Sequence, residues 1–169
     1  MKIYQSLFSS EFCDSLIPLI KNECVLSEAH HHPTNWFTWL IWGSPDRYEF
    51  GQLPKEKWND NILNLVNNEL SKTDSDIETK KLMWLQMTEY KDGRSLRRHR
   101  DSGTKQTAIV VLSNGFVGGD TFIWDPMVAD DRKIELNKGD GVLFNGHKQY
   151  HEIKSVTEGT RYALNFWFI

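Results

Sequence analysis

Apolar residues recur at helical spacing in two segments of the first half of the chain. Residues 55–72 carry an apolar stripe separated by Asn, Glu and Lys, which predicts an amphipathic helix with that stripe facing a core. The stripe consists of Trp58, Ile62, Leu65, Val66 and Leu70. A second helix is expected after Ser9, because Ser9 to Glu11 offer an N-cap and an acidic first turn. Pro18 is expected to kink or interrupt it, since proline has no amide hydrogen to donate.

From Lys81 onward the pattern changes to short runs of β-branched, aliphatic and aromatic residues, which favour strands. Turns such as Asn114-Gly115 and Gly118-Gly119 separate these runs. Strands are expected at residues 82–90, 107–113, 120–124, 133–136, 141–144, 151–156 and 162–169, and earlier at 3–8 and 35–42. Residues 91–98 and 125–133 are expected to be loops, and the second, rich in Asp, is placed near a cavity mouth as a lid.

Many short strands at even spacing, with helices confined to the first half, predict a mainly β fold with flanking helices, of the α+β kind. A jelly roll or closed barrel-like sandwich is expected, with the N-terminal helices packed on the outside of one sheet. A chain of 169 residues is long enough for one domain with a sizeable core. We expect a single domain over 1–169, in which 1–80 supports a β core at 81–169.

The composition is typical of a globular protein in water, with 39% apolar and 25% charged residues. A net charge of −3 gives no overall attraction to nucleic acid or to membrane surfaces. There is no run of about 18 apolar residues, so no membrane span is expected, and the first residues lack a signal-peptide pattern. Only Cys13 and Cys24 are present, which favours a reduced protein of the cytoplasm and leaves a disulfide between them open.

The candidate chemistry centres on His99-Arg100-Asp101, together with the distant His151. Two imidazoles and one carboxylate can occupy one face of an octahedral metal and leave the opposite face open. That is the ligand set of a non-haem Fe(II) oxygenase. A His-x-Asp pair is common by chance, so the prediction depends on the partners that accompany it.

Arg161 follows His151 by ten residues, beyond a turn at Gly159. If His151 and Arg161 lie on adjacent antiparallel strands, both point into one barrel interior. A buried guanidinium needs a carboxylate or similar partner. A dicarboxylate that bridges the metal and Arg161 meets this need, and 2-oxoglutarate has that shape.

Taken singly, these residues have ordinary interpretations as well. His99 fits a surface residue of a basic loop, His151 a packed strand residue, and Arg161 a surface partner of Glu158 or Glu152. Their joint spacing favours the metal site. Three further histidines, His30 to His32, are adjacent in a predicted loop, and we favour a structural or exposed role for them, because consecutive residues do not converge on one site.

A series of motifs in the second half of the chain follows a fixed order. These motifs are Tyr90-Lys91-Asp92-Gly93, His99-Arg100-Asp101, Thr107 to Leu112, Gly118-Gly119-Asp120-Thr121, Lys138 to Phe144, His151, Gly159-Thr160-Arg161-Tyr162 and Trp167. In order, spacing and turn residues, residues 82–169 resemble the prolyl-4-hydroxylase-like branch of the Fe(II)/2-oxoglutarate-dependent oxygenases. The resemblance implies a double-stranded β-helix, the cupin-like form of the jelly roll.

The resemblance also implies roles for individual residues. His99, Asp101 and His151 would bind Fe(II) and be the catalytic residues, and Arg161 would bind the distal carboxylate of 2-oxoglutarate. Tyr90, Thr121 and Trp167 match positions that line the 2-oxoglutarate pocket, although core packing is an equal interpretation of Trp167. The implied co-substrates are 2-oxoglutarate and O2, with ascorbate as a further candidate cofactor. The Asp at 101 argues against a halogenase, because halogenases lack this carboxylate.

The chain departs from the family pattern where substrate binds. Leu96 stands where a Tyr is common in hydroxylases of proline peptides, Thr104 falls near the position of a peptide-binding Arg, and Val111 replaces a frequent Tyr. These differences put a prolyl-peptide substrate in question and leave the oxygenase chemistry intact. Lys and Arg residues between Lys91 and Lys105 form a cationic rim, interpreted first as a solvated loop and second as a site for an acidic partner.

The sequence therefore predicts a dioxygenase that hydroxylates a C–H bond while it converts 2-oxoglutarate to succinate. A peptidyl-proline-type substrate is the leading expectation, and a peptide, protein or small molecule is favoured overall. The alternatives are a free amino acid, a nucleotide or a nucleic acid held by the cationic rim. A catalytically silent metal- or ligand-binding module is a different class of protein on the same fold. The expected assembly is a monomer or a homodimer.

Overall fold

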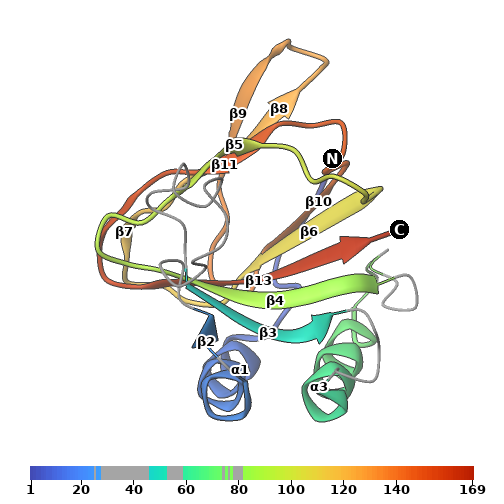
Figure 1. Ribbon diagram of the computed structural model, residues 1–169, viewed down its shortest axis with the longest axis vertical. Coiled ribbons are helices and arrows are strands. Elements are labelled where there is room, and N and C mark those ends of the chain that lie inside the picture. The colour runs from blue at the N-terminus through green and yellow to red at the C-terminus, as the bar shows by residue number, and fades with distance from the viewer. Residues whose placement is uncertain (25, 28–45, 53–58, 74, 76, 78–81) are drawn as a thin grey trace.

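The computed structural model describes residues 1–24, 26, 27, 46–52, 59–73, 75, 77 and 82–169, and in these parts two antiparallel sheets face each other (Figure 1). The larger sheet has seven strands, and the smaller has four. The larger sheet consists, in spatial order, of β1 (Lys2–Tyr4), β10 (Gly141–Phe144), β6 (Gln106–Val111), β13 (Arg161–Phe168), β4 (Leu82–Tyr90), β3 (Asp46–Gln52) and β2 (Leu26–Ser27).

The smaller sheet covers one part of the larger one and ends in a projecting hairpin (Figure 1). Its strands are β5 (Leu96–His99), β11 (His151–Ile153), β8 (Thr121–Asp125) and β9 (Asp130–Ile134). A short pair, β7 (Val117–Gly118) with β12 (Val156–Glu158), forms a separate two-stranded sheet. Because the chain crosses repeatedly between the two larger sheets, the architecture is a double-stranded β-helix, as the sequence predicts.

Two helices lie side by side on the outer face of the seven-stranded sheet (Figure 1). In α1 (Ser10–Glu23) the N-cap Ser9 accepts a hydrogen bond from the Phe12 amide, and in α3 (Asp60–Leu70) Asn59 does the same for Ile62. The predicted helical layer is therefore confirmed. The helix at Pro18 is continuous, so the interruption expected there is wrong. Proline has no amide hydrogen to donate to the carbonyl of Asp14, but both residues are exposed, so that carbonyl is open to solvent.

Alternation along β4 and β13 gives the seven-stranded sheet two different faces. Leu85 and Met87 of β4 and Leu164 and Phe166 of β13 pack into the core beneath the sheet, against the helices. The residues between them face the smaller sheet. A second, smaller core fills part of the space between the sheets, and it contains Ile109, Ile123, Ile134, Val142, Phe144 and Ala163.

Some predicted boundaries need correction. Residues 82–90 and 141–144 are strands as expected, but the strand expected at 3–8 covers only Lys2–Tyr4. The expected loop at 91–98 ends in β5, because Leu96 to His99 pair with β11. The expected lid at 125–133 is a hairpin of β8 and β9, in which ladder pairing overrides the polar composition. The predictions for residues 30–32, 35–42 and 55–58 lie outside the described residues.

Within the described residues, no helix is both long and apolar enough to cross a bilayer. Cys13 and Cys24 are free thiols. Burial raises the pKa of each to about 11, so both thiols stay protonated at neutral pH.

Replacement of Leu85 tests the core between sheet and helices. Leu85 is fully buried, and Leu85→Ala leaves a cavity that its neighbours fill only in part. We expect the free energy of unfolding to fall by about 2–5 kcal/mol, measured by chemical denaturation. The control is Val117→Ala, because Val117 is 52% exposed, and a change of similar size in the control would contradict the assignment of this core.

Candidate metal centre and ligand pocket

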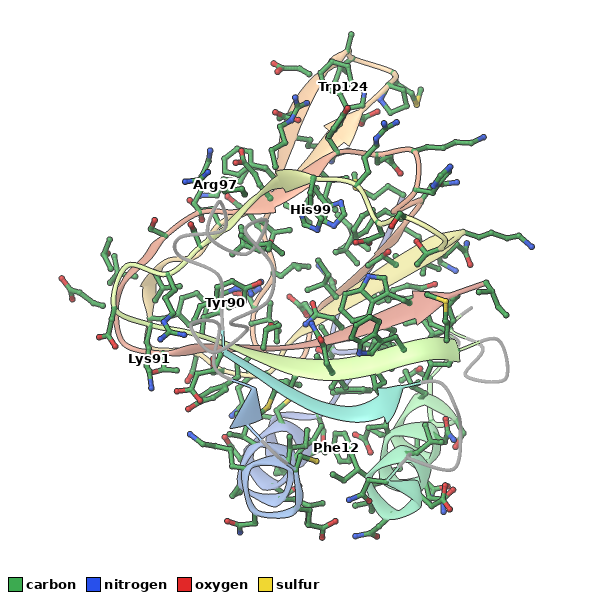
Figure 2. All side chains as sticks on the ribbon, in the orientation of Figure 1. Phe12, Tyr90, Lys91, Arg97, His99 and Trp124 are labelled. Carbon is green, nitrogen blue, oxygen red and sulfur yellow. The ribbon has the colours of Figure 1, made fainter. Side chains whose placement is uncertain are left out.

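Three side chains distant in sequence converge between the two sheets. His99 is the last residue of β5, Asp101 follows it closely, and His151 begins β11, where it pairs in register with His99. The potential ligand atoms of all three lie within 4.8 Å of one another. The Nε2 atoms of His99 and His151 are each 3.5 Å from a carboxylate oxygen of Asp101. Figure 2 shows His99 pointing from the smaller sheet toward the space between the sheets.

Backbone carbonyls orient both imidazole rings. Nδ1 of His99 lies 2.8 Å from the carbonyl oxygen of Arg97, and Nδ1 of His151 lies 3.1 Å from that of Gln149. A carbonyl can only accept, so Nδ1 carries a proton in each ring, and Nε2 is the nitrogen whose lone pair would bind a metal. The two lone pairs face the same point as the carboxylate, which is the arrangement a metal requires.

The charges of the cluster also suit a metal. Burial alone would raise the pKa of Asp101, but the hydrogen bond with His99, the proximity of His151 and the hydrogen bond from Thr107 together lower it. Burial lowers the pKa of His151 to about 4, and repulsion from His99 acts in the same direction. At neutral pH the cluster thus contains a carboxylate and a neutral imidazole at His151, the forms that ligate metals.

The backbone at Gly146 passes close to the side chains of Thr107 and Asp101, and contacts at this point hold the Asp101 carboxylate in place. The hydroxyl of Thr107 donates to Oδ2 of Asp101, and the amide of Asp101 donates to the carbonyl of Gly146. A Cβ atom at Gly146 would lie 2.1 Å from Oγ1 of Thr107 and 2.5 Å from Oδ2 of Asp101. The sequence marks Asn145-Gly146 only as a turn, so only the tertiary structure reveals this contact.

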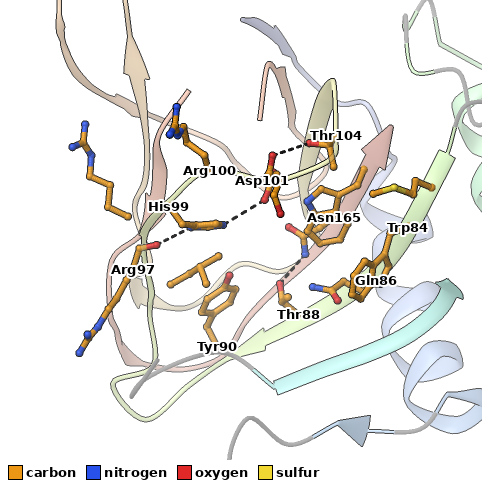
Figure 3. Close-up of a pocket in the computed structure, with 15 residues that line it drawn as sticks. Trp84, Gln86, Thr88, Tyr90, Arg97, His99, Arg100, Asp101, Thr104 and Asn165 are labelled. Atoms are coloured by element: carbon orange, nitrogen blue, oxygen red, sulfur yellow. Dashed lines mark hydrogen bonds and ion pairs between the residues drawn. The ribbon is translucent and has the colours of Figure 1, made fainter. Parts of the chain in front are cut away.

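A cavity of about 400 Å³ opens beside the cluster (Figure 3). His99 and Asp101 lie on its upper wall, and alternate residues of β4 and β13 form its floor. The floor residues are Trp84, Gln86, Thr88, Tyr90, Asn165 and Trp167. Paired residues across the two strands form a ladder in which Tyr90 is opposite Arg161 and Trp84 is opposite Trp167.

Arg161 lies at one end of this ladder and is 1% exposed. Its Nη2 donates to Oγ1 of Thr121 over 3.1 Å, and its guanidinium carbon lies 5.3 Å from the ring centroid of Tyr90. Its Nη1 has no hydrogen-bond partner in the described part of the chain. Burial lowers the pKa of Arg161, which expresses the cost of a charge removed from water without a carboxylate in contact.

The condition that His151 and Arg161 lie on adjacent antiparallel strands is not met. His151 belongs to the four-stranded sheet and Arg161 to the seven-stranded sheet, so they face each other across the interior. Arg161 and Thr121 line a second cavity of about 280 Å³, whereas the cavity beside His99 reaches only to Tyr90. Tyr90 therefore separates the guanidinium from the larger cavity.

Trp167 occupies the other end of the ladder, six residues from Arg161. At about 3.3 Å per residue, roughly 20 Å of strand separates the two. The ring of Trp167 packs against Trp84, with centroids 5.7 Å apart. Trp167 and Arg161 therefore lie at opposite ends of the ladder.

A cluster of two histidines and a carboxylate, beside a cavity inside a double-stranded β-helix, is the ligand set typical of a non-haem Fe(II) oxygenase. Residues 85–169, half of the chain, match the model of the 2OG-Fe(II) oxygenase superfamily. The chain belongs to this superfamily. It is therefore an oxygenase that uses Fe(II), 2-oxoglutarate and O2. No curated protein matches the sequence significantly.

Solved structures with the same fold include prolyl hydroxylases. A prolyl hydroxylase of Trichoplax adhaerens, in complex with a hypoxia inducible factor peptide fragment, has a TM-score of 0.70 and 16% identity, over 99% of this chain and 82% of that one. A 2OG-Fe(II) oxygenase family protein of Burkholderia pseudomallei gives 0.65 and 13%, over 97% and 80%. The viral collagen prolyl hydroxylase of Paramecium bursaria Chlorella virus-1 gives 0.57 and 19%, over 98% and 93%.

Substitution of a single ligand tests the metal centre. We expect His99→Ala and Asp101→Ala each to weaken Mn(II) or Co(II) binding by more than about 100-fold, because loss of an orienting partner alone costs 10- to 100-fold. Titration calorimetry measures the affinity. His147→Ala is the matched control, since His147 is an exposed histidine outside the cluster. Unchanged affinity in either ligand variant would remove that residue from the site.

The backbone approach at Gly146 gives an independent prediction. The added methyl of Gly146→Ala displaces Thr107 and Asp101, so we expect metal affinity to fall about 10- to 100-fold, as for loss of an orienting contact. Circular dichroism should show a folded protein, and His147→Ala again serves as the control. A Gly146→Ala variant that binds metal as tightly as the parent protein would show that Asp101 does not depend on this contact.

Proposed function

We propose that the protein is a hydroxylase that inserts oxygen into a C–H bond of its substrate and converts 2-oxoglutarate to succinate and CO2. In this proposal His99, Asp101 and His151 hold Fe(II), and Arg161 binds the distal carboxylate of 2-oxoglutarate. The observation that carries it is the unpartnered Nη1 of the buried Arg161, in the same interior as the candidate metal-ligand cluster. When bound, iron, 2-oxoglutarate and O2 supply the oxidising chemistry.

The residues around Arg161 prepare it for a carboxylate. Thr121 accepts a hydrogen bond from Nη2 and thereby fixes the guanidinium plane, while Nη1 keeps its hydrogens for a ligand. A Cβ at Gly119 would lie 2.8 Å from Cδ of Arg161, so glycine leaves room for the side chain. Asp120 forms an ion pair with Lys133 at 3.0 Å, and its charge acts on Arg161 without an ion pair between the two. An arginine held in this way forms strong two-point contacts with a carboxylate.

The rest of the cavity excludes water and orients the substrate. The side chains of Trp84, Trp167 and Leu96 give it a mainly apolar lining beside His99 and Asp101. Removal of water strengthens the electrostatic contacts of Arg161 and limits side reactions at the metal centre.

The leading substrate is a peptidyl proline or a similar peptide residue. The fold shared with enzymes described as prolyl hydroxylases supports this choice. Leu96 and Thr104, which depart from the family pattern, both line the cavity beside His99, whereas Val111 lines the cavity beside Arg161. The pocket for the hydroxylated residue therefore differs in its lining from the pattern expected for proline peptides.

An anionic substrate, such as a nucleotide, is the second candidate. Arg97 and Arg100 are exposed at the cavity, and neither is paired with a carboxylate in the described residues. Arg98 forms an ion pair with Asp131 and stacks on Tyr150. The cationic rim is thus only partly neutralised.

Substitution of Arg161 tests the co-substrate site. We expect Arg161→Ala to weaken 2-oxoglutarate binding by about 10- to 100-fold, the effect of a lost charge-assisted contact, while Mn(II) affinity stays within a few-fold. Arg161→Lys keeps the charge and should lose less. Arg132→Ala removes an exposed arginine of β9 and is the control. Equal 2-oxoglutarate affinity in the parent and Arg161→Ala proteins would contradict the assignment.

Substrate-stimulated succinate release tests the reaction itself. Purified protein with Fe(II), 2-oxoglutarate and ascorbate is incubated with proline peptides, free amino acids and nucleotides, and products are identified by mass spectrometry. We expect stimulation by proline peptides and a product 16 mass units heavier, the mass of one oxygen atom. Stimulation by nucleotides alone would replace the leading substrate with the second candidate. Binding of metal and 2-oxoglutarate without succinate from any substrate would favour a silent binding module.

A further inference from the structure

Two buried polar atoms on the cavity floor have no partner within the described residues. They are the indole Nε1 of Trp84 and the amide Oε1 of Gln86. Both side chains line the cavity beside His99 and Asp101 (Figure 3), and Gln86 is only 4% exposed. The remaining unpartnered atoms of this kind are Nη1 of Arg161 and Oδ1 of Asn67, which lies on α3 in the helical layer.

Their positions on β4 make them a matched pair. Trp84 and Gln86 are two residues apart on one strand, so both side chains leave the same face of the sheet. Nε1 of an indole can only donate a hydrogen bond, and Oε1 of a carboxamide can only accept one. An apolar residue at either position would avoid the cost of an unpaired buried group, so a ligand with the complementary atoms is the simplest reason for this pair.

Trp84 and Gln86 lie toward the end of the β4–β13 ladder that is opposite to Arg161. Along the paired strands, Tyr90 is opposite Arg161, Gln86 is opposite Asn165, and Trp84 is opposite Trp167. Thr107, which holds the carboxylate of Asp101, is in register with Trp167 on its other side. The metal cluster is therefore next to the Trp84 end of the ladder, and a molecule bound there is the substrate and not 2-oxoglutarate.

We propose that Trp84 and Gln86 form an amide subsite that binds the backbone of a peptide substrate, in an extended conformation, beside the residue that is hydroxylated. In an extended chain the N–H and C=O of one residue point to the same side. The N–H donates to Oε1 of Gln86, and the C=O accepts from Nε1 of Trp84. The residue that binds here is not proline, because proline has no N–H. This inference rests on the proposed hydroxylase function and specifies how its substrate is held.

The charge of the subsite favours an amide over an anion. The side chains at this end of the floor, Trp84, Gln86, Thr88, Asn165 and Trp167, are all neutral. Of the rim cations, Arg98 stacks on Trp124 and Tyr150, and Arg100 stacks on Tyr150. The two indoles, inclined at 50° to each other, add an apolar wall against which a side chain can pack. A peptide amide fits both contacts, whereas a fully ionised phosphate can only accept and would leave Oε1 of Gln86 unpaired.

Variants that keep shape and remove one polar atom test the subsite. Gln86→Leu removes the acceptor, and Trp84→Phe removes the donor but keeps an aromatic ring. Gln106→Leu and Trp124→Phe are the controls, since Gln106 is exposed outside the cavity and Trp124 lies on the hairpin (Figure 2). The probes are short proline-containing peptides, and versions of each with an N-methyl group on one residue that flanks the proline. Titration calorimetry on protein loaded with Mn(II) and 2-oxoglutarate measures their affinity without turnover.

We expect each variant to bind the peptides about 3- to 10-fold more weakly, the effect of one lost hydrogen bond, with 2-oxoglutarate affinity unchanged. One N-methyl position should weaken binding to the parent protein by a similar factor and have no further effect in Gln86→Leu, because the two changes remove the same contact. The controls should bind as the parent protein does.

The outcomes separate this inference from the proposed function. Equal peptide affinity in the parent, Gln86→Leu and Trp84→Phe proteins would overturn the subsite, even where peptides are hydroxylated. Saturable binding of nucleoside monophosphates in place of peptides, or no peptide binding at all, would overturn it as well. The proposed hydroxylase function fails separately, on the absence of succinate with every substrate class.

Discussion

The antiparallel pairing of β4 with β13 is the constraint on which the core and the cavity both depend. The register runs from Arg161 opposite Tyr90 to Phe168 opposite Leu82. Since side chains alternate between faces, one register places Leu85 and Phe166 against the helices and Gln86 and Asn165 in the cavity. A slip of one residue would exchange the two sets, burying amides in the helical core and exposing leucines to the metal centre.

Burial of Arg161 gives this interior its electrostatic character. A guanidinium removed from water is stable only with partners, and the protein supplies one hydroxyl and one aromatic face. In the proposed function, a carboxylate of 2-oxoglutarate would offset this cost by pairing with the unpartnered Nη1.

Backbone groups position the side chains of the candidate metal cluster. Carbonyl groups of Arg97 and Gln149 set the ring orientation of the two histidines, and Gly146 allows the strand segments to meet at Asp101. The candidate metal-ligating histidines come together only because β5, which carries His99, pairs with β11, which carries His151, in the smaller sheet. The same sheet carries Thr121, which fixes the guanidinium of Arg161 across the interior.

The class of fold, the β-rich second half and the metal-ligand candidates His99, Asp101 and His151 could be predicted from the amino-acid sequence. These features are local or appear as motifs in a fixed order, so spacing and turn residues are sufficient to predict them. The fold was needed to show that His151 and Arg161 lie on opposite sheets and that Trp167 is far from Arg161. It also showed that Trp84 and Gln86 each present to the cavity a polar atom with no partner among the described residues. Pairing between strands that are distant in sequence sets these positions. The alternation of side chains along a strand does not show which face of the sheet packs in the core and which lines the pocket.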